Sequence, residues 1–129
     1  MKRIFRFYPL TLLVIVLVTT VCLMPIEDPP LKDVPFIDKW THMALFGGIL
    51  SVLLFELTMN GRLFTRWKWY AALFSIAYGG AIEIMQATLT TCRSGEWLDF
   101  FADAFGVVVL FPVSFFILKT LSKRCFTSE

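Results

Sequence analysis

Hydrophobic residues occur in four long blocks, at about 8–24, 38–58, 69–89 and 98–121, and the segments between them are short and polar. A helix of about 20 apolar residues crosses the roughly 30 Å hydrocarbon core of a bilayer. Short connections between successive helices favour antiparallel neighbours. The pattern therefore predicts an all-α fold, a bundle of four transmembrane helices that forms one domain over residues 1–129.

The first block follows the basic residues Lys2, Arg3 and Arg6, an arrangement that resembles a signal peptide. No small-x-small cleavage site follows the apolar run, which ends at Pro25. We therefore interpret it as an uncleaved first transmembrane helix with an anchoring role.

Composition supports a membrane protein and excludes several other classes. Hydrophobic residues make up 57% of the chain and charged residues 17%, against about 45–50% and 25% in soluble domains. A net charge of +2 is too small to indicate a nucleic-acid partner, so the bilayer is the predicted partner. No glycine-rich phosphate loop or other cofactor motif is present, and no cofactor is predicted. A Cys22–Cys92 bridge is an alternative to reduced thiols, which we favour.

The distribution of lysine and arginine predicts the orientation. Three of these residues lie in each of the N-terminal segment, the middle connection and the C-terminal end, which makes nine, whereas the other two connections hold three, Lys32, Lys39 and Arg93. The positive-inside rule then places both termini in the cytoplasm. We expect a multi-pass protein of a bacterial cytoplasmic membrane.

This orientation gathers the uncommon polar residues of the apolar blocks at the outer surface. Charge inside or beside lipid is costly, so each of these residues needs a partner or a function. Glu83 lies about two turns, or ~9 Å, below the outer end of the third helix at ~1.5 Å per residue. The predicted polar layer consists of Asp38, Lys39, His42, Glu83, Gln86, Arg93, Asp99 and Asp103.

Glu83 is the strongest candidate within this layer, because a carboxylate between Ile82 and Ile84 must be paired, hydrated or protonated. With His42 and Asp103 it could serve as acid or base. The alternative is a structural hydrogen bond that ties the helices together. Asp38 shares a helix face with His42 and is an expected N-cap.

The other charged residues have simpler interpretations. Asp99 is an expected N-cap of the fourth helix. Arg93 is the expected cation between Asp99 and Asp103; a divalent metal is the alternative, but no standard ligand spacing is present and no metal is predicted. Glu56 is expected to pair with Arg62 or Arg66.

Small residues in the last three blocks predict close helix packing. Ala44 and Gly48 form a small-xxx-small step, and Gly79 and Gly106 lie on the polar faces of their helices.

The ordered polar motifs resemble the VanZ-like membrane protein family. They read D-K-x-x-H from Asp38, E-x-x-Q from Glu83 and R-x5-D from Arg93, followed by Gly106, and the resemblance covers about residues 36–118. Asp103 departs from the pattern, which usually has asparagine there. The resemblance implies a small multi-pass membrane protein, and its namesake is associated with resistance to the glycopeptide teicoplanin.

We therefore expect a cell-envelope protein that binds or modifies an amphiphilic molecule at the outer leaflet. Arg93, Lys39 and His42 could pair an anionic head group. Two alternatives stay open: a non-catalytic interaction or assembly subunit, and an ion-coupled transporter, which would require an oligomer of such a small chain.

Overall fold

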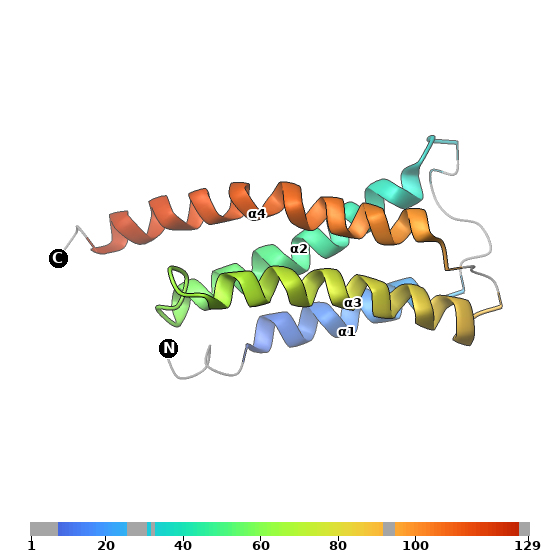
Figure 1. Cartoon of the computed structure of the whole chain (residues 1–129), viewed down its shortest axis with the longest axis horizontal. Helices are drawn as coiled ribbons and strands as arrows, with labels where there is room; N and C mark the ends of the chain where they lie inside the picture. The colour runs from blue at the N-terminus through green and yellow to red at the C-terminus, as the bar shows by residue number, and fades with distance from the viewer. Residues whose placement is uncertain (1–7, 26–30, 32, 92–94, 127–129) are drawn as a thin grey trace.

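The chain folds into four helices, and the computed structural model describes residues 8–25, 31, 33–91 and 95–126. The helices are α1 (Pro9–Leu23), α2 (Ile37–Met59), α3 (Trp67–Leu89) and α4 (Trp97–Phe126). Successive helices run in opposite directions, and α2 and α3 separate α1 from α4 (Figure 1). The predicted all-α bundle is confirmed, and no strand occurs in the described part of the chain.

Three helices are long and apolar enough to cross a membrane: α2, α3 and residues Trp97–Arg124 of α4. This indicates a membrane protein. The first helix differs from the prediction, because α1 has only 15 residues, or about 22 Å at ~1.5 Å per residue. Large apolar side chains are exposed on every helix, as Leu13, Trp40, Ile84 and Phe101 illustrate, which is the pattern of surfaces that face lipid.

The most extensive helix contact joins α2 and α4, which run in the same direction. Glycine allows this approach, because a Cβ added to Gly106 would lie 2.4 Å from the Met43 carbonyl oxygen. Gly47 faces the same contact, where its added Cβ would lie 3.1 Å from the Gly106 carbonyl oxygen. The predicted packing role of Gly48 is wrong, since nothing lies within 4 Å of a Cβ there, and Ala44 is exposed.

Gly79 of α3 also packs closely, as predicted. A Cβ at this position would lie 2.7 Å from Asp103 Oδ2 and 2.9 Å from Asp103 Cβ. The missing side chain of Gly79 therefore leaves the space that the Asp103 carboxylate occupies.

Glu56 of α2 holds the start of α1, at the end of the bundle opposite the predicted polar layer. Its Oε1 accepts a hydrogen bond from the Leu10 amide at 2.8 Å, and its Oε2 accepts from the Thr11 amide at 3.1 Å and the Thr11 hydroxyl at 2.5 Å. A carboxylate suits unpaired amides at a helix N-terminus. The expected pairing with Arg62 or Arg66 is wrong; both arginines are described, and neither forms an ion pair with Glu56.

Two predicted helix caps are also wrong. The N-cap of α2 is Phe36, so Asp38 lies inside the helix, where its charge still suits the first turn. In α4 the amides of Asp99 and Phe100 donate to the Glu96 carbonyl oxygen. Asp99 therefore lies in the first turn of α4 and does not cap it.

Candidate functional site

Three buried ionisable side chains from three helices meet near the start of α4. His42 of α2, Glu83 of α3 and Asp103 of α4 are 3%, 7% and 0% exposed. His42 Nδ1 lies 2.9 Å from Asp103 Oδ1 and 3.5 Å from Glu83 Oε1. We call these residues the His42 trio. They are the three that the sequence predicted for acid or base chemistry, and the structure brings them together.

The two carboxylates of the His42 trio are only partly satisfied. Glu83 Oε2 accepts a hydrogen bond from the Glu96 amide at 3.0 Å, and Asp103 Oδ1 contacts His42. Glu83 Oε1 and Asp103 Oδ2 are buried without a hydrogen-bond partner, and they are the only such side-chain atoms among the described residues. An unsatisfied buried charged oxygen carries a large desolvation cost.

Glu56 provides a comparison within the same chain. Both of its oxygens accept hydrogen bonds, and it is 0% exposed. Glu56 therefore has a structural role: from α2 it caps the N-terminus of α1, and both of its oxygens are satisfied. Glu83 also satisfies an amide at a helix start, but its second oxygen has no such partner, which distinguishes it from a purely structural carboxylate.

A second group, which we call the Lys39 cluster, lies beside the trio. Lys39 Nζ contacts Asp99 Oδ1 at 2.9 Å and Glu96 Oε2 at 3.4 Å. The Asp99 side chain is 6% exposed and that of Lys39 is 25% exposed, so this pair is more protected than a surface salt bridge. Lys39 supplies the cation for Asp99 that we had expected from Arg93.

The remaining predicted residues are distributed differently. Gln86 turns away from the trio, and its Nε2 donates to the Cys22 carbonyl oxygen of α1 at 2.9 Å. Asp38 is exposed, although one of its oxygens lies within 4.8 Å of ligand atoms of His42 and Asp99. Arg93 lies outside the described part of the chain, as does Cys92, whose bridge to Cys22 was the alternative to reduced thiols.

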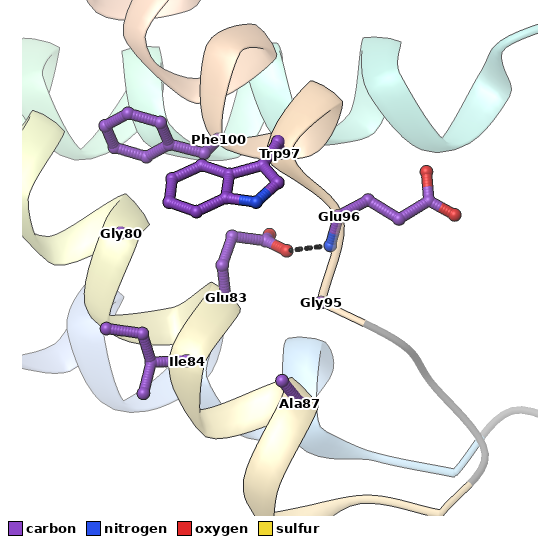
Figure 2. A pocket seen from close by; sticks show the side chains of 8 residues that line it. All are labelled: Gly80, Glu83, Ile84, Ala87, Gly95, Glu96, Trp97 and Phe100. Atoms are coloured by element: carbon purple, nitrogen blue, oxygen red, sulfur yellow. Dashed lines mark hydrogen bonds between the residues drawn. The ribbon is translucent and has the colours of Figure 1, made fainter.

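A pocket opens between α3 and α4, with Glu83 in its wall (Figure 2). Its volume is about 280 Å³, close to the lower limit of ~300 Å³ for small-molecule sites. Figure 2 shows the Glu83 carboxylate reaching from α3 towards the start of α4, near the ring of Trp97. We call this the lateral pocket; it is lined by Gly80, Glu83, Ile84, Ala87, Gly95, Glu96, Trp97 and Phe100.

Several residues of this pocket were missed by sequence reasoning. Gly95 allows the segment before α4 to pass close to α3, since a Cβ there would lie 2.4 Å from the Glu83 carbonyl oxygen. Trp97 and Phe100 supply aromatic walls. The signal in the sequence that could have indicated them is their position just after Gly95, at the start of the helix that follows Glu83 in the chain.

The charge of the site is predominantly negative. Five carboxylates, from Asp38, Glu83, Glu96, Asp99 and Asp103, lie near Lys39 and His42, and carboxylates already contact both of these. Both basic side chains therefore already have acidic partners within the chain. The described residues favour a ligand that brings hydrogen-bond donors or positive charge.

Comparison with protein-family models, with curated proteins and with solved structures found no match.

Proposed function

We propose that this chain is a small multi-pass protein of the bacterial cell envelope that binds a membrane amphiphile in the lateral pocket. The observation that carries the proposal is the position of Glu83, a largely buried carboxylate in the wall of a mostly apolar pocket. A carboxylate accepts a hydrogen bond from a hydroxyl or ammonium group. The ligand would therefore carry such a group on its head.

The size and surroundings of the pocket support an amphiphile over a soluble molecule. About 280 Å³ accommodates part of a lipid, and the rest of the molecule needs an apolar surface outside. Ile84 and Trp97, which line the pocket, are 67% and 80% exposed. In a bilayer their outer faces would contact acyl chains.

The charge distribution supports an orientation with both termini in the cytoplasm, as the nine lysines and arginines at one end against three at the other indicate. The lateral pocket would then open into the outer leaflet. A fusion of alkaline phosphatase after Gly61 should be inactive in this orientation. An active fusion at that position would contradict it.

The resemblance to the VanZ-like family supports an envelope role, because it rests partly on His42 and Glu83, which lie 3.5 Å apart beside this pocket, and on Lys39, which pairs with Asp99. A deletion strain is expected to show an altered lipid or envelope profile by mass spectrometry. Teicoplanin susceptibility should be measured in the same strain. An unchanged envelope profile would count against the proposal.

Photocrosslinking tests the pocket directly. A benzophenone amino acid at position 87, in the pocket wall, should crosslink to a lipid in membranes, and the adduct can be identified by mass spectrometry. The matched position is 77, which is also exposed on α3 but lines no described pocket. Equal lipid adducts at both positions would indicate general bilayer contact and would contradict a specific site.

Two substitutions test the ligand contact. Ala87→Phe should fill the pocket and reduce the amount of co-purified ligand, whereas Ala77→Phe should not. Glu83→Gln keeps the shape but replaces an acceptor oxygen with an amide, so it should also reduce binding. If Glu83→Gln instead loses folded protein in proportion to any phenotype, Glu83 has only a structural role.

A further inference from the structure

The atoms of the His42 trio are spaced like ligands of one metal ion. Ligands about 2.0–2.2 Å from a tetrahedral or octahedral ion lie roughly 3.0–3.5 Å from one another. The observed distances from His42 Nδ1 are 2.9 Å to Asp103 Oδ1 and 3.5 Å to Glu83 Oε1. One ligand atom from each of the three residues lies within 4.8 Å of the others. Both spacings from His42 therefore match those of ligands around one ion.

The unpaired oxygens are an independent observation that points to a ligand. Glu83 Oε1 and Asp103 Oδ2 are the only buried side-chain oxygens or nitrogens without a hydrogen-bond partner in the described part of the chain, and both belong to the trio. Buried polar atoms in folded proteins are nearly always satisfied by protein, water or an ion. An ion at this place would satisfy Glu83 Oε1 directly and could also draw on either oxygen of Asp103.

Charge balance favours a divalent cation. Two carboxylates with a neutral imidazole carry two negative charges in a nearly water-free place, which is unfavourable. A divalent ion neutralises both. By contrast, Asp99 has Lys39 as its cation and Glu56 has a complete set of donors. With a neutral imidazole, the His42 trio is thus the place where the described residues leave buried carboxylates without a cation.

We infer that His42, Glu83 and Asp103 form a binding site for one divalent transition-metal ion. One imidazole nitrogen and carboxylate oxygens suit Zn²⁺, Mn²⁺, Fe²⁺ or Co²⁺, whereas Ca²⁺ and Mg²⁺ prefer oxygen alone. The ion would join α2, α3 and α4 at one point. Gly79 contributes space, because a Cβ at that position would lie only 2.7 Å from Asp103 Oδ2.

Titration with Co²⁺ tests this inference. The full chain, purified with a tag that contains no histidine and stripped with EDTA, should bind one equivalent of Co²⁺, seen by visible absorption and displaced by Zn²⁺. Glu83→Gln and Asp103→Asn should each weaken binding at least as much as the roughly 10–100-fold loss typical of outer-shell substitutions. Glu56→Gln, another buried carboxylate, should bind like the wild type. A wild-type chain that binds no Co²⁺ overturns the inference.

X-ray absorption of the wild-type Zn²⁺ complex gives an answer that needs no variant. His42 is the only histidine, so one imidazole with oxygen ligands identifies this site. A shell made only of oxygen, or one with sulfur, would overturn it.

Two further variants separate alternatives. Asp38, His42 and Asp99 form a second group with metal-like spacing; if Asp38→Asn abolishes binding and Glu83→Gln does not, the ion lies there and the inference is wrong. Ala87→Phe should block the lateral pocket yet bind Co²⁺ normally. The metal site goes beyond the proposed function, and the two can fail separately. Ala87→Phe tests ligand binding in the lateral pocket, whereas Asp103→Asn tests metal binding by the His42 trio.

Melting temperatures give a second readout of the same site. Zn²⁺ should raise the melting temperature of the wild type, because an ion that binds only the folded state stabilises it. In EDTA, Glu83→Gln should melt no lower than the wild type, since it removes a buried charge, and Zn²⁺ should leave it unchanged. An equal rise with Zn²⁺ in wild type and Glu83→Gln would contradict the assignment of Glu83.

Discussion

Substitution of Gly106 by alanine should separate α2 from α4 and disturb the His42 trio. The added Cβ would lie 2.4 Å from the Met43 carbonyl oxygen and 2.8 Å from Met43 Cα. Both contacts are with backbone, which cannot rotate away as a side chain can. Met43 follows His42 in α2, and Gly106 lies one turn after Asp103 in α4. A movement of the two helices apart at this point therefore also changes the distance between His42 and Asp103.

The distances set the size of the effect. An ordinary contact begins at 3.4 Å, so the helices must separate by 3.4 − 2.4 = 1.0 Å at this point. Such overpacking costs about 1–3 kcal/mol, and the better helix propensity of alanine offsets about 1 kcal/mol of it. A shift of this size would lengthen the 2.9 Å contact between His42 Nδ1 and Asp103 Oδ1 beyond the ~3.2 Å limit of a good hydrogen bond. We therefore expect a net loss of up to about 2 kcal/mol, with weaker metal binding.

Gly48→Ala is the matched control, because it makes the same chemical change on α2 with nothing within 4 Å of the new Cβ. It should be neutral or stabilise the protein by about 0.5–1 kcal/mol. Gly47→Ala should fall between the two, since its nearest contact is the flexible side chain of Leu110 at 2.4 Å. Denaturation of the purified variants in detergent measures all three. Equal stability of Gly106→Ala and Gly48→Ala would refute the reasoning.

Substitutions at three further residues test contacts between helices. Glu56→Gln should lower the free energy of unfolding in detergent by about 1–3 kcal/mol, because the amides at the start of α1 lose a charged acceptor; wild-type stability would contradict this. Lys39→Met should cost about 1 kcal/mol, a modest value because Lys39 is partly exposed, and Lys39→Arg should retain most of the Asp99 contact; identical denaturation of both variants would argue against the pair. Gln86→Leu should cost about 1 kcal/mol and speed hydrogen exchange in α1, since the Cys22 carbonyl loses its donor; unchanged exchange would show that the bond contributes nothing.

The sequence predicted the helices well because apolar blocks are a strong and local signal. It also predicted that His42, Glu83 and Asp103 would converge, because alternating helix direction brings their levels together. The helix starts were less accurate. Glu56 and Glu83 satisfy amides at the starts of other helices, and no local pattern reveals a partner so distant in the chain.

Helix neighbours explain the other differences. Spacing shows which residues share a face of one helix, but not which helix that face meets. Gly47, and not Gly48, faces α4 because α2 packs alongside α4. Glu83 and Gln86 lie three residues apart on α3, yet Glu83 faces His42 while Gln86 faces α1. Both distinctions depend on the three-dimensional order of the helices.

The short first helix has a consequence for the surrounding bilayer. At 15 residues α1 is about 22 Å long, whereas the hydrocarbon core is about 30 Å thick. If α1 crosses the bilayer, the lipids beside it must thin to match its length, at a cost of a fraction of a kcal/mol per Å. On the opposite side, α4 exceeds the bilayer thickness and extends past the other helices (Figure 1). The two sides of the bundle therefore differ in length, with α1 of 15 residues on one side and α4 of 30 residues on the other. In vesicles with coexisting thick and thin lipid phases, the protein should concentrate in the thinner phase.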